Sequence, residues 1–186
     1  MSGGHGHLDT SNKRIALLVA VLAALLAISE MGGKSSQTNA LSSHIDASNL
    51  WTFFQAKTIR QTTMRTAAEE AEATFKDSAQ GMPAAMKAQT ERWRQTAQRY
   101  ESEPETGEGR KELMARAKVK EEHRTKSLAA YHMFEYASAA FQLAIVLAGA
   151  AALTTVMWLT FISVGLGVVG AACTILAFVA PTLIHL

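Results

Sequence analysis

His132 and Glu135 are the two side chains of this 186-residue chain whose types and spacing come nearest to a reactive site. Residues three apart on a helix share one face, so the imidazole and the carboxylate could supply the first two ligands of a metal ion. A di-iron carboxylate bundle needs repeated Glu-x-x-His pairs with further glutamates from other helices, and the sequence has no second copy. We therefore interpret His132 and Glu135 as an interfacial pair, placed where charged sequence gives way to apolar sequence.

Glu30 and Gln142 are polar residues at the edge of, or within, otherwise apolar segments. An acidic group near membrane depth costs free energy and is a functional-site hypothesis by default. Glu30 could pair with Lys34 one turn later, or it could simply lie in the headgroup region if the first span ends early. Gln142 could form a hydrogen bond to another helix. We treat Glu30 and Gln142 as a possible intramembrane polar site.

The remaining residues of reactive type do not assemble into a site. Cys173 is the only cysteine, which excludes an internal disulfide, and its apolar neighbours indicate a buried small side chain. His5 and His7 offer weak adventitious metal affinity, and His185 is a tail residue. The 165–170 stretch matches a dinucleotide-binding pattern but follows no strand. We expect no catalytic residue, no cofactor and no metal, so the protein is not expected to be an enzyme.

The distribution of charge defines the elements that hold these residues. Although 18% of the chain is charged, no Asp, Glu, Lys or Arg occurs in 136–186, and Glu30 is the only charge in 15–33. Apolar runs of this length indicate transmembrane helices. The ionisable residues concentrate between these runs and are nearly balanced in sign. The net charge of +2 does not suggest a nucleic-acid partner.

We expect an all-α membrane protein with three transmembrane helices and a helical, coiled-coil-like extramembrane segment between the first and the second. The first span is short, and a signal peptide with a cleavage site near 27–29 is its alternative; we expect an uncleaved span. The last extramembrane helix could continue into the second span as one rod. The expected limits are a tail at 1–14, spans at 15–33, 134–154 and 157–180, an extramembrane segment at 34–133 with helices at 37–80, 83–102 and 110–133, and a tail at 181–186.

Two stripes of residues predict helix packing. One alternates steps of four and three residues, as in a helix that packs lengthwise on a partner, and the other repeats small residues every four. The first stripe is narrow and interrupted by polar residues, so we expect it to associate with other copies; the alternative is that the helices close on one another within the chain. The stripes are Leu50, Phe54, Lys57, Gln61 and Met64, and Ser163, Gly167 and Ala171.

Three stretches of the chain, at 12–34, 37–62 and 134–155, resemble an uncharacterised bacterial family of small membrane proteins. The family is a domain of unknown function with one N-terminal and two C-terminal spans, and the stretch NLWTFFQAKTIRQT is the most distinctive part. The resemblance implies the three-span layout and no activity. It also implies a shared structural role, as buried inter-helix hydrogen bonds or as cations that reach headgroups, for Trp51, Phe53, Phe54, Gln55, Lys57 and Arg60.

These observations favour a non-enzymatic, self-associating scaffold or accessory subunit, whose partners are the lipid bilayer, further copies and another membrane complex. The alternative is an oligomeric cation-conducting pore with an acidic ring at Glu30. Lys13 and Arg14 before the first span favour a bacterial inner-membrane orientation with a cytoplasmic N-terminus and a periplasmic helical segment. The cations in 116–126, before the second span, favour the opposite orientation.

Overall fold

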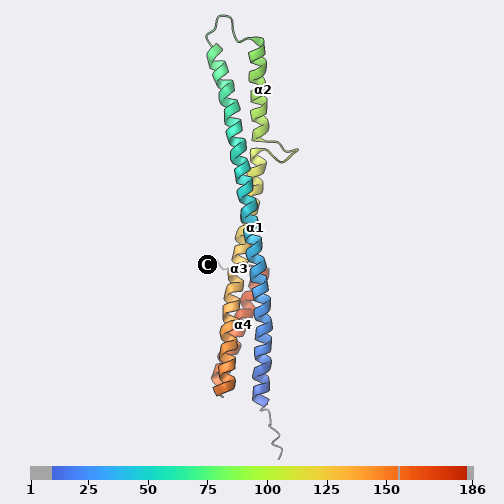
Figure 1. Cartoon of the computed structure of the whole chain (residues 1–186), viewed down its shortest axis with the longest axis vertical. Coiled ribbons are helices and arrows are strands. Elements are labelled where there is room, and N and C mark those ends of the chain that lie inside the picture. Colours follow the sequence, from blue (N-terminus) through green and yellow to red (C-terminus); the bar gives the residue numbers. More distant parts are fainter. Residues whose placement is uncertain (1–9, 155, 184–186) are drawn as a thin grey trace, which may run out of the picture. The chain divides into compact units, whose positions relative to one another are not determined.

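The computed structural model describes residues 10–154 and 156–183. His5, His7 and His185 lie outside the described residues. Within the described ranges the chain forms helices and turns and no strand. The helices are α1 (Thr10–Phe75), α2 (Ala84–Glu101), α3 (Arg110–Thr154) and α4 (Met157–Val179), as labelled in Figure 1.

Three of these helices, α1, α3 and α4, contain stretches long and apolar enough to cross a membrane. The expected all-α fold with three candidate spans is therefore confirmed. The first span and the helix expected at 37–80 form one helix, α1, which ends at Phe75. The segments expected at 110–133 and 134–154 likewise form one helix, α3. Neither α1 nor α3 contains a proline, so nothing interrupts the backbone hydrogen bonds where the composition changes.

Turns separate α1, α2 and α3. Gly81 has a φ of 67°, a left-handed conformation that side-chain-bearing residues rarely adopt, and Pro83 directly precedes α2. Gly107 has the same φ in the turn between α2 and α3. The two glycines thus lie within the turns, and Pro83 sets the start of α2.

The chain divides into two compact units. The apolar unit comprises Met1–Leu41 and Arg124–Leu186, and so contains the N-terminal part of α1, most of α3 and all of α4. The polar unit comprises Ser42–His123, and contains the rest of α1, all of α2 and the start of α3. Each unit is described separately below.

In the apolar unit α3 and α4 pack antiparallel. The Ser163 hydroxyl donates a 2.7 Å hydrogen bond to the carbonyl of Ala144, and the ring of Phe134 meets that of Phe178 edge to face at 5.1 Å. The contacts thus pair the late part of α3 with the early part of α4, and the reverse. A buried cluster around Phe141 and Leu22 joins α1 to the pair.

Glycine permits this close approach of helices in the apolar unit. A Cβ added at Gly167 would lie 2.8 Å from Leu22 Cδ2, and one at Gly170 would lie 2.8 Å from the ring of Phe141. Ser163 and Gly167, from the predicted small-residue stripe, are buried, and Ala171 packs against the cluster around Phe141. All these contacts lie within one chain.

Candidate functional site

A polar groove lies between α1 and α3 in the apolar unit. Its volume is about 530 Å³. On α1 its lining residues recur at intervals of three or four, and on α3 they recur at three, four or seven, so each helix presents one face along the whole length of the groove. We call this feature the boundary groove, and its polar lining residues are Ser29, Glu30, Lys34, Gln37, Tyr131, Glu135, Ser138 and Gln142.

The boundary groove lies at one end of the predicted spans. The ring of Phe134, where the second span was expected to begin, rests against Gly32 in the last turn of the first span. The same ring meets Phe178, near the end of the third span, at 5.1 Å. The end of the first span, the start of the second and the end of the third therefore lie at one level. That level is the expected edge of the hydrocarbon region.

One wall of the boundary groove is held by a hydroxyl pair. Ser29 is fully buried, and its Oγ lies 2.8 Å from Thr174 Oγ1. Thr174 donates its own hydrogen to the carbonyl of Gly170 at 2.9 Å. Ser29 is therefore the donor to Thr174, and the pair links α1 to α4 beside the polar lining.

Four polar lining residues of the boundary groove have no side-chain partner among the described residues. In the part of the chain that the structure describes, the side chains of Glu30, Lys34, Gln37 and Gln142 make no hydrogen bond or ion pair. The suggested pairing of Glu30 with Lys34 is thus not formed, and both residues are exposed. The groove brings together Glu30, Gln142 and Glu135, which the sequence suggested only as separate features.

Glu135 differs from the other groove residues because its carboxylate is held by neighbours on α3. Tyr131 donates a 2.6 Å hydrogen bond to Oε1, and His132 Nδ1 lies 3.1 Å from Oε2. Within the described residues no cluster of three or more His, Cys, Asp or Glu side chains lies close enough to hold a metal. The side chains of His132 and Glu135 are each about half exposed, and this pairing holds the Glu135 carboxylate at the groove.

The polar unit contains a second cluster, which sequence analysis missed. Arg110, the first residue of α3, donates to Thr58 Oγ1 at 2.9 Å, to Gln61 Oε1 at 2.5 Å and to Glu101 Oε2 at 2.8 Å. Its guanidinium lies 5.0 Å from the ring centre of Phe54. We call these five residues the arginine cluster. They connect α1, the end of α2 and the start of α3.

Gln61 is the buried centre of the arginine cluster, with 2% of its surface exposed. Its amide nitrogen donates to the carbonyl of Ala97 at 3.1 Å and to Glu101 Oε2 at 2.8 Å. The hydrogen bond from Gln61, assisted by the charge of Arg110, lowers the pKa of Glu101 although burial opposes the shift. A signal for the cluster was available, because a cation in the first turn of a helix is disfavoured by the helix dipole and so suggests a specific partner.

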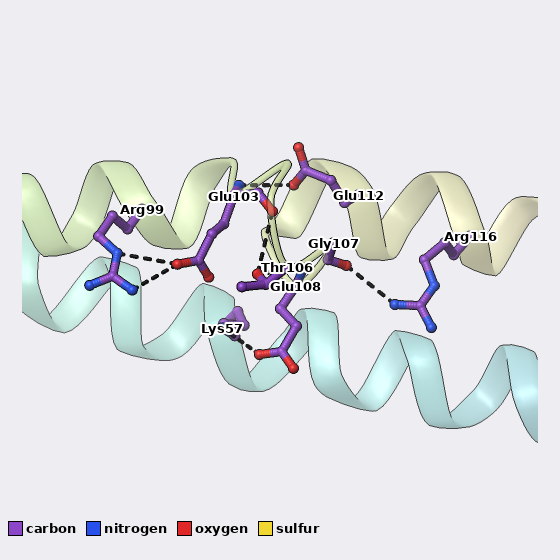
Figure 2. Close-up of polar contacts among 8 residues, drawn as sticks. All are labelled: Lys57, Arg99, Glu103, Thr106, Gly107, Glu108, Glu112 and Arg116. Atoms are coloured by element: carbon purple, nitrogen blue, oxygen red, sulfur yellow. Dashed lines mark hydrogen bonds and ion pairs between the residues drawn. The ribbon is translucent and has the colours of Figure 1, made fainter.

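The turn between α2 and α3 is fixed by further polar contacts, shown in Figure 2. Arg99 donates to Glu103 Oε1 through two of its nitrogens, at 3.2 and 2.7 Å. Arg116 donates to the carbonyl of Gly107 at 3.2 Å, and Lys57 lies 3.7 Å from Glu108. These contacts tie the turn to each of the helices beside it.

The other residues named from the sequence make packing or polar contacts within their own unit, or lie on its surface. Lys57 lies 5.3 Å from the ring centre of Tyr100, and Trp51 donates a 2.8 Å hydrogen bond to Glu121. Leu50 and Met64 are half-buried in the polar unit. Cys173 packs against the cluster around Phe141. The side chains exposed on the surface of α1 include Phe53, Gln55 and Arg60.

The model of one family, described as a domain of unknown function (DUF4337), matches residues 11–180. The match covers most of the chain and assigns no activity. No curated protein and no solved structure matches the chain.

Proposed function

We propose that this chain, which belongs to the DUF4337 family, is a non-enzymatic, self-associating membrane protein that acts as a scaffold or as an accessory subunit of a membrane complex. The observation that carries the proposal is an exposed stripe along α1 in the polar unit. The stripe follows steps of seven residues with intermediate positions four residues on, which is the spacing of a coiled-coil seam. Its residues are Ile45, Thr52, Ala56, Ile59, Thr63, Thr66 and Ala73, and the same spacing also includes the exposed polar residues Asn49 and Glu70.

This second stripe is distinct from the stripe expected to join copies. Gln61 and Phe54, from the first stripe, contact residues of their own chain, so association needs another surface. Ile45 and Ile59 are 50% and 67% exposed. Two of the three threonine hydroxyls do not need a partner, because Thr52 and Thr63 each donate to the carbonyl four residues earlier. The stripe therefore combines apolar and threonine side chains on one exposed face, and a second copy complements it by symmetry.

Mass measurement tests the proposed association. The full chain in detergent or in nanodiscs should form a dimer or larger assembly, and Ile59→Glu should shift it toward monomer because a charge in the seam opposes pairing. Val119→Glu is the matched control, since Val119 is also exposed, at 52%, but lies on α3. A monomer over a wide concentration range would overturn the proposal.

For the orientation we propose a bacterial inner-membrane location with a cytoplasmic N-terminus and a periplasmic polar unit. Support comes from Lys13 and Arg14, both exposed, at the start of the first span. A reporter enzyme that is active only outside the cytoplasm, inserted at Gly81 in the turn before α2, should be active. An inactive insertion there, with an active fusion at the N-terminus, would reverse the orientation.

A second candidate function is a cation-conducting pore formed by several copies. It is favoured by one observation, the exposed and unpaired carboxylate of Glu30 in the boundary groove, which Gln142 also lines. Rings of acidic side chains select cations when copies surround an axis. Cation flux into liposomes that Glu30→Gln abolishes would support a pore, and absence of flux from the wild-type chain would remove it.

A further inference from the structure

We propose that the boundary groove binds the headgroup of a zwitterionic phospholipid with a primary ammonium, that is, phosphatidylethanolamine. The proposal concerns a ligand and stands apart from self-association. The groove lies at the level where Gly32, Phe134 and Phe178 meet. At the edge of the hydrocarbon region, lipid headgroups are the molecules present at the highest concentration.

The groove contains both signs of charge that this headgroup needs. Glu30 and Glu135 provide carboxylates for the ammonium, and Lys34 provides an ammonium for the phosphate. Charge-assisted hydrogen bonds of this kind are about twice as strong as neutral ones. Two carboxylates against one cation favour a ligand with a positive end over a purely anionic lipid.

The absence of partners for three of these residues also favours a bound headgroup. In the described part of the chain, Glu30, Lys34 and Gln142 have no side-chain partner although they share one groove. An unpaired carboxylate at the edge of the hydrocarbon region costs free energy that a cationic partner would offset. Glu135 is positioned by Tyr131 and His132, and its carboxylate still has room to accept hydrogen bonds.

A lipid fits the surroundings better than a soluble amine does. The groove extends from Lys34 at the rim to Gln142, two helical turns into the second span from Glu135. Exposed apolar residues follow the groove residues along both helices, among them Met31, which is 74% exposed, and Leu143, which is 58% exposed. Acyl chains would lie against such side chains while the headgroup occupies the groove.

The chemistry of the lining also separates ethanolamine from choline. A primary ammonium donates three hydrogen bonds, which carboxylates and amide oxygens accept, whereas a quaternary ammonium donates none. Quaternary ammonium groups are usually held by the faces of several aromatic rings. Here two aromatic residues, Tyr131 and Phe134, line the groove, and the ring of Phe134 is engaged by Gly32 and Phe178, which leaves one ring and not a cage of several.

Native mass spectrometry of the full chain tests the proposal. The protein, in detergent with equimolar phosphatidylethanolamine, phosphatidylcholine and phosphatidylglycerol of identical acyl chains, should retain the ethanolamine lipid preferentially. Glu30→Gln should lower the ratio of ethanolamine to choline adducts about tenfold, equivalent to about 1.4 kcal/mol. Lys34→Gln should reduce all three lipids, because all carry the phosphate. Glu69→Gln and Lys118→Gln, exposed residues of the polar unit, are matched controls.

A second measurement needs no substitution. Adding one, two and three methyl groups to the ethanolamine nitrogen removes hydrogen-bond donors stepwise, so retention by the wild-type chain should fall at each step. Equal retention across this series, a preference for phosphatidylglycerol, or a preference that Glu30→Gln leaves unchanged would overturn the proposal. The same spectra report copy number. A monomer that retains ethanolamine lipid would contradict self-association and would still support the lipid site.

Discussion

The ring of Phe134 rests directly on the backbone of Gly32, so that a Cβ added at Gly32 would lie 2.6 Å from Phe134 Cζ. Glycine inside a helix costs about 1 kcal/mol relative to alanine. The two adjacent glycines of α1, Gly32 and Gly33, thus lie inside a helix against local preference. They allow α1 and α3 to approach at the level of the boundary groove.

We expect Gly32→Ala to destabilise the apolar unit despite the gain in helix propensity. The ring of Phe134 must move away from the new methyl group, and overpacking of this kind costs about 1–3 kcal/mol. Unfolding in mixed micelles with increasing SDS, followed by circular dichroism, measures the change.

Gly165→Ala is the control for this substitution, because a Cβ there meets nothing within 4 Å. It should be neutral or stabilise α4 by up to about 1 kcal/mol. Equal effects of the two substitutions would show that Phe134 does not require the glycine.

The Ser29–Thr174 hydroxyl pair gives a second prediction. Ser29→Ala should destabilise the apolar unit by only about 0.6 kcal/mol, the average for hydrogen bonds between membrane helices. The loss is small because Thr174 keeps its bond to the carbonyl of Gly170 and no donor is left unpaired. Ser35→Ala, at an exposed position of α1, is the control for the same unfolding measurement. A loss above 2 kcal/mol would mean that the hydroxyl does more than join α1 to α4.

The fold was predictable because it depends on local composition. Long apolar runs and the absence of proline from α1, α3 and α4 are properties of adjacent residues, and they identify the helices and candidate spans directly. The resemblance of the chain to a family with three spans is likewise confirmed. The limits of the spans were harder to predict, because no local residue marks where α1 or α3 would leave the bilayer.

The boundary groove was only partly predictable. Glu30 and Gln142 stood out because polar residues are rare in apolar sequence. Their shared groove with Glu135 depends on the register between α1 and α3, which the contact of Phe134 with Gly32 sets. That register is a tertiary property, and no spacing within either helix encodes it. The partners of Arg110 in the arginine cluster were missed for the same reason, although its place at the start of α3 was itself a signal.

Arg110 gives the third prediction. Arg110→Ala should destabilise the polar unit by about 2 kcal/mol, less than the 3–5 kcal/mol of a fully buried pair because the Arg110 and Glu101 side chains are 22% and 34% exposed. Amide hydrogen exchange should increase in residues 97–101, where Gln61 and Arg110 hold the end of α2.

Arg110→Lys should be intermediate, since it keeps the charge and loses the planar fork that reaches three acceptors. Arg92→Ala is the control, because Arg92 is exposed on α2. If all three variants exchange at the wild-type rate, the cluster contributes nothing to the stability of the polar unit.

The final prediction concerns pH and Glu101. The hydrogen bond from Gln61, with the charge of Arg110, lowers the pKa of Glu101 in the folded state, although burial opposes the shift. A carboxylate with a depressed folded pKa stabilises the folded state above its unfolded pKa, and that contribution is lost as the pH falls through the folded value. We therefore expect the end of α2 to exchange its amides faster, after correction for intrinsic rates, as the pH falls below the ordinary range of a glutamate. Glu101→Gln should flatten this dependence, whereas Glu69→Gln, on the exposed surface of α1, should preserve it. An unchanged slope in Glu101→Gln would assign the acid sensitivity to another carboxylate, of which Glu103, with its pKa lowered by the hydrogen bond from Arg99, is the next to test.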